Sequence, residues 1–150
     1  MNNLSYSERK TENPPIMPLD ISPLSNALRR LDEGMARYLR DTSDTQIRDG
    51  LIQRFEFTYE LAHKMLKRHL ESASPTPGEF DSADFSYLIR SASEHGLLLS
   101  DWSQWKQYRD MRAKTSHTYD EDIALAVVAG IPVFQKEAHH LHDQILARSR

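Results

Sequence analysis

Apolar side chains recur along most of the chain at spacings of three and four residues, the period of an amphipathic α-helix. This pattern predicts five helices. No segment alternates between apolar and polar positions as a half-buried β-strand does, and no internal repeat of roughly 20 to 50 residues is present. The predicted fold class is therefore all-α, an up-and-down bundle of four to five helices.

Two long helices are predicted first, over residues 22–40 and 45–72. Ser22 can cap the first helix, and Pro23 follows at the first helical position, where proline is well tolerated. Gly50 weakens the second helix only slightly. The apolar positions of the two helices are Leu24, Leu28, Leu31, Met35, Tyr38 and Leu39, and then Ile47, Leu51, Ile52, Phe55, Tyr59, Ala62, Leu66 and Leu70.

A turn is predicted at residues 74–78, because two prolines and a glycine stop the second helix. A short third helix follows, and Gly96 ends it in the manner of a C-terminal glycine. The fourth helix begins at Ser100 or Asp101 and ends near Ser116.

The last predicted helix begins close to Asp120 and continues to the C-terminus. Thr118 and Glu121 have the spacing of a capping box, although Asp120 is an alternative cap. Pro132 is expected to bend or break this helix. Its apolar stripe comprises Ile123, Val127, Ile131, Phe134, Ala138, Leu141 and Ile145.

One bundle domain is predicted, residues 21–150, behind a flexible tail of residues 1–20 that has little apolar surface to bury. The tail lacks the apolar core of a signal peptide, and no later run is long enough to span a bilayer. The chain has no cysteine, which excludes disulfides and thiolate-bound metal. These features favour a soluble, cytoplasmic protein that does not engage a membrane.

The formal net charge of -3 argues against a protein that coats nucleic acid through bulk attraction, so any RNA contact must be local. A local candidate is the segment that contains Arg112, Lys114, His117 and Tyr119. A guanidinium can hold phosphate oxygens, an imidazole can move a proton near neutral pH, and a phenol can accept a transferred group.

Arg112 and His117 are five positions apart, which on a regular helix turns them away from each other by about 140°. Their cooperation requires the helix to end between them, or a second subunit to complete the site. A purely structural role also fits, because Arg112, Lys114 and His117 would stabilise the carbonyl end of the fourth helix.

The string Arg112-x4-His117-x-Tyr119 resembles the R-x4-H-x-Y motif of HEPN domains, the higher eukaryotes and prokaryotes nucleotide-binding family. The resemblance extends to residues 48–62, Gly96-Leu97, Trp105 and residues 116–121. These segments are similar to the branch of the family called nucleotidyltransferase substrate-binding proteins. The resemblance covers residues 24–146.

This resemblance implies a helical bundle that pairs as a homodimer, with Arg112 and His117 of both subunits lining a cleft. Members of the branch are typically encoded beside a minimal nucleotidyltransferase, which in toxin–antitoxin pairs adds AMP to the motif tyrosine. The implied function is to act as substrate-binding partner of such an enzyme. Arg112, Lys114, His117 and Tyr119 would bind nucleotide or RNA phosphate, and Tyr119 would be the AMP acceptor.

Related HEPN domains act as metal-independent ribonucleases, which gives an alternative function as a ribonuclease toxin. His117 would move the proton of a ribose 2′-hydroxyl or of the leaving oxygen, and Arg112, helped by Lys114, would stabilise charge on the phosphate. The family commonly has asparagine directly after the arginine, where this chain has Ala113. That departure favours binding over cleavage, since phosphate capture does not need the amide.

A metal site is a weaker interpretation, and no metal or cofactor is expected. Glu60-x-x-His63 and Glu137-x-x-His140 match the pattern of di-iron helices. His140, however, projects about 120° from the core position Phe134. The histidines at positions 139, 140 and 142 are therefore interpreted as a solvated face, and His63 receives no role.

Two further groups have both a structural and a binding interpretation. Trp102 and Trp105 could stack on bases, but their spacing of three favours burial of one helix edge. The basic patch of Lys64, Lys67 and Arg68 either extends an anion-binding cleft or forms a solvated helix face.

Overall fold

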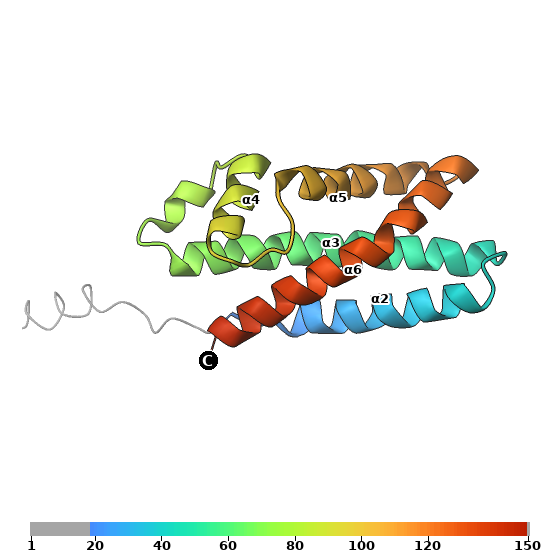
Figure 1. Ribbon diagram of the computed structural model, residues 1–150, viewed down its shortest axis with the longest axis horizontal. Helices are drawn as coiled ribbons and strands as arrows, with labels where there is room; N and C mark the ends of the chain where they lie inside the picture. The colour runs from blue at the N-terminus through green and yellow to red at the C-terminus, as the bar shows by residue number, and fades with distance from the viewer. Residues whose placement is uncertain (1–18, 150) are drawn as a thin grey trace, which may run out of the picture.

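A computed structural model describes residues 19–149, which form five α-helices and two short 3-10 helices without any strand (Figure 1). The predicted all-α fold is therefore confirmed, whereas most of the predicted tail lies outside the described residues. Within residues 19–149, none of the helices is both long and apolar enough to cross a membrane. The elements are α2 (Ser22–Arg40), α3 (Thr45–Ala73), η1 (Pro77–Phe80), α4 (Phe85–Glu94), α5 (Trp102–Lys114), η2 (Thr115–His117) and α6 (Glu121–Arg148).

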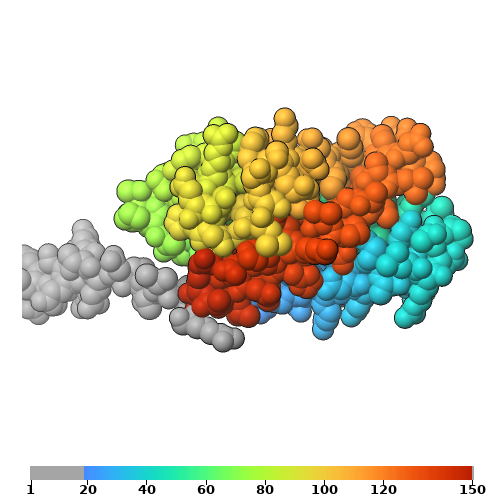
Figure 2. Space-filling model, in the orientation of Figure 1, coloured from blue at the N-terminus to red at the C-terminus, as the bar shows by residue number. Residues whose placement is uncertain are grey.

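The long helix α3 is the centre of the bundle and contacts every other helix. In Figure 1, α2 lies along one side of α3, α4 and α5 lie along the other, and α6 crosses over it. The space-filling view shows α6 covering one face between α2 and the α4–α5 side (Figure 2). Phe55, Ala62 and Leu66 of α3 are fully buried, so the predicted apolar stripe is the side of α3 that forms the core.

Aspartate side chains cap four of the five described α-helices by accepting hydrogen bonds from backbone N–H groups of the first turn. Such a cap satisfies donors that have no partner within the helix. The helix starts therefore follow directly from local sequence. The four caps are Asp44, Asp84, Asp101 and Asp120.

The predicted cap of α2 is wrong, whereas at α6 one of the two alternative caps is confirmed. The cap position of α2 is Ile21 rather than Ser22, because Asp20 already accepts the backbone N–H of Ser22 at 3.0 Å. At α6 the cap is Asp120 rather than Thr118, whose hydroxyl instead donates to the carbonyl of Thr115 at 3.4 Å.

Pro132 does not break α6, which continues through it as one helix. Proline removes the hydrogen bond to the carbonyl of Val128, at a typical cost of about 3 kcal/mol. The neighbouring side chains Ile131 and Phe134 are fully buried, and their burial offsets that cost. The assignment of Leu39 to the apolar stripe of α2 is also wrong, because 66% of its surface is exposed.

The end of α4 agrees with the sequence. Gly96 has φ of 72°, a left-handed conformation, and its N–H donates to Ser93 while the N–H of Leu97 donates to Ala92. This pair of bonds is the Schellman motif, which satisfies the last carbonyl groups of a helix. Glycine is required here because any larger residue is strained at positive φ.

Gly96→Ala is expected to lower the free energy of unfolding by about 1 kcal/mol, because alanine is strained in the left-handed region. Gly50→Ala is the matched control. Gly50 lies inside α3 with nothing within 4 Å of an added Cβ, so this change is expected to raise stability by about 0.5–1 kcal/mol. Urea denaturation followed by circular dichroism measures both. Shifts of the same sign would contradict the assignment.

Candidate functional site

The regular helix α5 ends between Arg112 and His117, as their cooperation requires. It stops at Lys114, and the chain tightens into η2. Thr115 stabilises this junction: its hydroxyl donates to the carbonyl of Arg112 at 2.7 Å and accepts from Nη1 of Arg112 at 3.3 Å. The change of helix type therefore rests on a side chain that also holds the guanidinium.

Arg112 extends toward α3, where it meets two carboxylates. Its Nε donates to Oε1 of Glu60 at 3.0 Å, its Nη2 also pairs with Glu60, and Nη2 lies 3.4 Å from Oε1 of Glu56. The hydrogen bond that Arg112 donates to Glu60 raises the pKa of Arg112 above its ordinary value. The positive charge of Arg112 is thus offset within the chain, and a phosphate must share or displace these carboxylates to bind it.

His117, Lys114 and Tyr119 lie on the surface around η2. The rings of His117 and Tyr119 meet edge-to-face with centroids 6.1 Å apart, and 87% of Tyr119 is exposed. No hydrogen bond among the described residues joins Arg112 to His117. The predicted site therefore separates into a surface pair, His117 with Tyr119, and an arginine turned toward α3.

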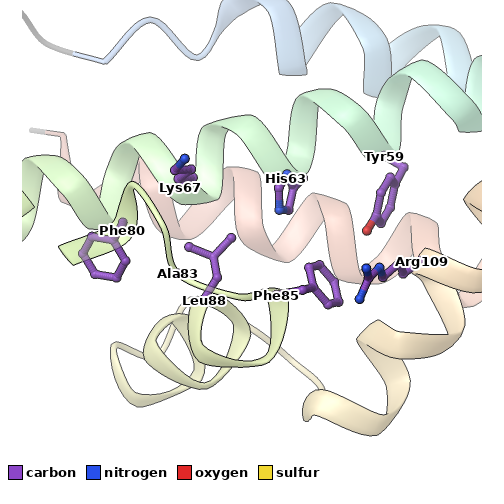
Figure 3. Close-up of a pocket in the computed structure, with 8 residues that line it drawn as sticks. All are labelled: Tyr59, His63, Lys67, Phe80, Ala83, Phe85, Leu88 and Arg109. Carbon is purple, nitrogen blue, oxygen red and sulfur yellow. The ribbon is translucent and has the colours of Figure 1, made fainter. Parts of the chain in front are cut away.

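A pocket of about 330 Å³ opens beside Arg112, where α3 faces α4 and α5 (Figure 3). From α3 it receives Tyr59, His63 and Lys67, and from α5 it receives Arg109, one turn before Arg112. Sequence reasoning gave His63 no role and left the Lys67 patch open between two interpretations. The sequence does show a cation on each of the two helices, Lys67 and Arg109, but only the packing shows that both line the same pocket.

Burial controls the ionisation of two groups in this pocket. It raises the pKa of Tyr59 to about 12, although Arg109 and Arg112 act in the opposite direction. Burial also lowers the pKa of His63, and the positive charges of Lys67 and Arg109 lower it further. The His63 ring stacks on Tyr59 at 6.4 Å between centroids. Tyr59 is therefore a protonated hydroxyl near neutral pH, and His63 favours its neutral form.

Comparison with known proteins now decides the family. A family model described as "Nucleotidyltransferase substrate binding protein like" matches residues 19–147. The chain belongs to this family. The resemblance seen in the sequence is therefore confirmed at the level of the family.

A curated protein and a solved structure that match this chain both come from Haemophilus influenzae. A protein named "Probable ribonuclease HepT" is 43% identical over 101 residues, which are 67% of this chain and 68% of that protein. A solved structure described as the fold of a substrate binding domain of a nucleotidyltransferase matches with a TM-score of 0.78 at 34% identity. That match covers 84% of this chain and 98% of the other.

The two glutamates of the possible metal pattern, Glu60 and Glu137, have other partners in this chain. Glu60 pairs with Arg112, while the buried Glu137 accepts the backbone N–H of Leu99 at 2.6 Å. Within residues 19–149, no three His, Cys, Asp or Glu side chains are grouped as metal ligands.

The interpretation of residues 139–142 as a solvated face is wrong for His142, whose side chain is 16% exposed, whereas that of His139 is 44% exposed. Nε2 of His139 lies 2.8 Å from Asp32, and Nε2 of His142 lies 2.6 Å from Ser25, so both attach α6 to α2. The tryptophans agree with the sequence interpretation, since Trp105 is fully buried and Trp102 packs against the core.

Replacing His63 with Phe is expected to make stability less dependent on pH. The pKa of His63 is lower in the folded chain than the 6.5 of an unperturbed histidine, so below that value the unfolded chain binds the proton more readily. The stabilising contribution is complete above 6.5 and is lost as the pH falls through the folded pKa. His69, whose pKa is also lowered, keeps its effect in both proteins.

Urea midpoints at about pH 7.5 and about pH 5.5 test this expectation. The loss of stability on acidification should be smaller in His63→Phe than in the parent chain. Equal losses in the two proteins would mean that burial and the two cations do not disfavour protonated His63.

Proposed function

We propose that this chain is the substrate-binding partner of a minimal nucleotidyltransferase and acts as a homodimer. In this proposal the region of Arg112, Lys114 and His117 binds nucleotide or RNA phosphate, and Tyr119 is the residue that receives AMP. The observation that carries the proposal is the exposure of Tyr119, which is 87%. A partner enzyme can therefore reach the phenol hydroxyl, as it must to transfer a group to it.

The surroundings of Tyr119 suit an acceptor. It lies on the short connection between η2 and the capped start of α6, so its backbone is held while its ring projects into solvent. His117 packs against that ring, and Lys114 is one turn earlier at the end of α5. These basic residues would attract the phosphates of an incoming nucleotide.

The transfer itself is a displacement at phosphorus. The phenol oxygen of Tyr119 forms a bond to the α-phosphorus of ATP, the bond from that phosphorus to pyrophosphate breaks, and the phenol proton leaves to a base. The printed description of the solved relative, a substrate binding domain of a nucleotidyltransferase, supports assigning the nucleotide chemistry to a separate enzyme. This chain then supplies the acceptor and its positioning.

A homodimer is supported by apolar surface on α6. Leu125 and Val133 expose 46% and 50% of their surface on the helix that begins just after Tyr119. Pairing along this helix would cover these side chains and bring two copies of the η2 region toward each other. A second copy could then contribute its His117 near the Arg112 that is held by Glu60.

The decisive experiment combines this chain with a minimal nucleotidyltransferase, ATP and magnesium, followed by intact-mass measurement. The parent chain is expected to form a complex and to gain the mass of one AMP group. Tyr119→Phe should abolish the gain, whereas the control Tyr87→Phe, a 46% exposed tyrosine of α4, should keep it. Absence of both a complex and an AMP adduct on Tyr119 would overturn the proposal.

The second candidate function is a metal-independent ribonuclease, which the name of the 43% identical relative favours. His117 would act on the ribose hydroxyl or the leaving oxygen, and Arg112 would stabilise the phosphate. Arg112 pairs with Glu60 and Glu56, so it can take this role only if RNA displaces a carboxylate. Ala113 in the position of the common asparagine ranks this candidate below the first.

RNA incubated with the free protein in the presence of a chelator tests this candidate. If the chain cleaves RNA, His117→Ala should slow cleavage by about 100-fold or more, while the control His140→Ala should leave the rate unchanged. Glu60→Gln should not slow it, because that change removes a competing negative charge from Arg112. Cleavage that survives His117→Ala would remove this residue from the mechanism.

A further inference from the structure

The pocket beside Arg112 combines basic groups with an apolar wall. Lys67 and Arg109 stand on opposite sides of it, on α3 and α5, and Phe85 lies between His63 and Arg109 in the close-up view (Figure 3). Phe80, Ala83 and Leu88 form the apolar part of the lining. A ligand that matches this lining must carry both negative charge and apolar surface.

The cations of this pocket lack the carboxylate partners that Arg112 has. Among the described residues, neither Lys67 nor Arg109 forms an ion pair, whereas Arg112 pairs with both Glu56 and Glu60. Two arginines one turn apart on α5 therefore differ in available charge. In a chain of net charge -3, this pocket is a local positive site at which an anion can be held without displacing a carboxylate.

Arg109 is also held in position for such a contact. Its guanidinium carbon lies 5.0 Å from the centroid of the Phe85 ring, a cation–π arrangement. Phe85 in turn packs against Trp102 at 5.3 Å and His63 at 5.7 Å between centroids. With the guanidinium placed on this ring, its N–H edge remains available for the paired hydrogen bonds that arginine makes with phosphate.

The hydroxyl of Tyr59 points toward Arg109 in Figure 3 and adds a neutral donor beside the cation. Because burial raises its pKa to about 12, this hydroxyl keeps its proton and can donate to a phosphate or sugar oxygen. Phe80 and Leu88 line the pocket but are only 3% and 4% exposed, so they are fixed in the core and present an apolar edge to a base.

The size of the pocket limits the ligand. Its volume of about 330 Å³ is at the lower end of the range of about 300–1,000 Å³ that is usual for small-molecule sites. One nucleotide unit fits this size, and a longer chain would have to continue outside. We propose that this pocket binds a single nucleoside phosphate, with its phosphate on Arg109, its base against Phe80, Ala83 and Leu88, and Lys67 adding positive charge across the pocket.

This site is distinct from the Tyr119 region, and its argument does not depend on the function proposed above. A free nucleotide and one residue of an RNA strand present the same phosphate and base, so both are ligands of the same class. The pocket faces the side of α5 that also carries Arg112, which places the bound phosphate on the same α3–α5 face as the motif arginine.

The test is a titration of the full chain with AMP by calorimetry, with Trp102 fluorescence as a second readout because Trp102 contacts the pocket residue Phe85. The double variant Lys67→Gln with Arg109→Gln is expected to bind AMP at least tenfold more weakly. Its matched control is Lys64→Gln with Lys106→Gln, which removes equal charge from exposed positions of the same two helices outside the pocket and should bind like the parent.

Further ligands separate the two halves of the site. Inorganic phosphate should compete with AMP in the parent chain and lose that ability in the double variant. Ala83→Leu, which fills the apolar part without changing charge, should weaken AMP but leave phosphate competition intact. Displacement of AMP by a short single-stranded RNA would identify the RNA strand as a source of the nucleotide, and failure to displace would identify the free nucleotide.

The proposal is overturned if AMP does not bind the parent chain, or if the double variant and its control bind AMP equally. Circular dichroism of each variant confirms that binding is compared between folded proteins. Calorimetry of the Lys67→Gln, Arg109→Gln double variant reports this pocket, whereas intact mass of Tyr119→Phe reports AMP transfer, so failure of one proposal is distinguished from failure of the other.

Discussion

The aromatic contact between α3, α5 and α6 is the interaction on which the rest of this structure depends. Phe134 of α6 meets Phe55 of α3 edge-on at 4.9 Å and Tyr108 of α5 at 5.3 Å. Tyr108 then contacts the fully buried Trp105. These rings fix the rotation of α5 about its axis, so Arg109 and Arg112 face α3. The positions of the pocket and of the motif arginine follow from that orientation.

The face that α3 presents to α5 is divided by charge. Its earlier part carries Glu56 and Glu60, and its later part carries His63 and Lys67. The two arginines of α5 meet different halves of this face: Arg112 is neutralised by carboxylates, and Arg109 lies across the pocket from Lys67. One helix pair thus produces both a braced motif arginine and a pocket with uncompensated positive charge. In the two proposals made above, the pocket attracts phosphate and the motif arginine orients it.

Much of the fold was predictable because its signals are local. Helix periodicity, the aspartates that begin four helices and the glycine that ends α4 act within one or two turns of the chain. Distant packing decided what local preference left open at Pro132, whose buried neighbours keep α6 continuous. The prediction failed at His142, whose partner on α2 is more than a hundred residues away.

The sequence by itself determined the family, the helical class and the identity of the motif residues Arg112, His117 and Tyr119, because spacing and residue type are properties of the chain alone. Only the tertiary structure decided what each of these groups contacts. The pairing of Arg112 with Glu60 spans 52 positions, and the pocket joins residues of α3 to Arg109 of α5. The physical reason is that charge compensation and pocket shape depend on distances between side chains, and helix packing sets those distances without leaving a periodic trace in the sequence.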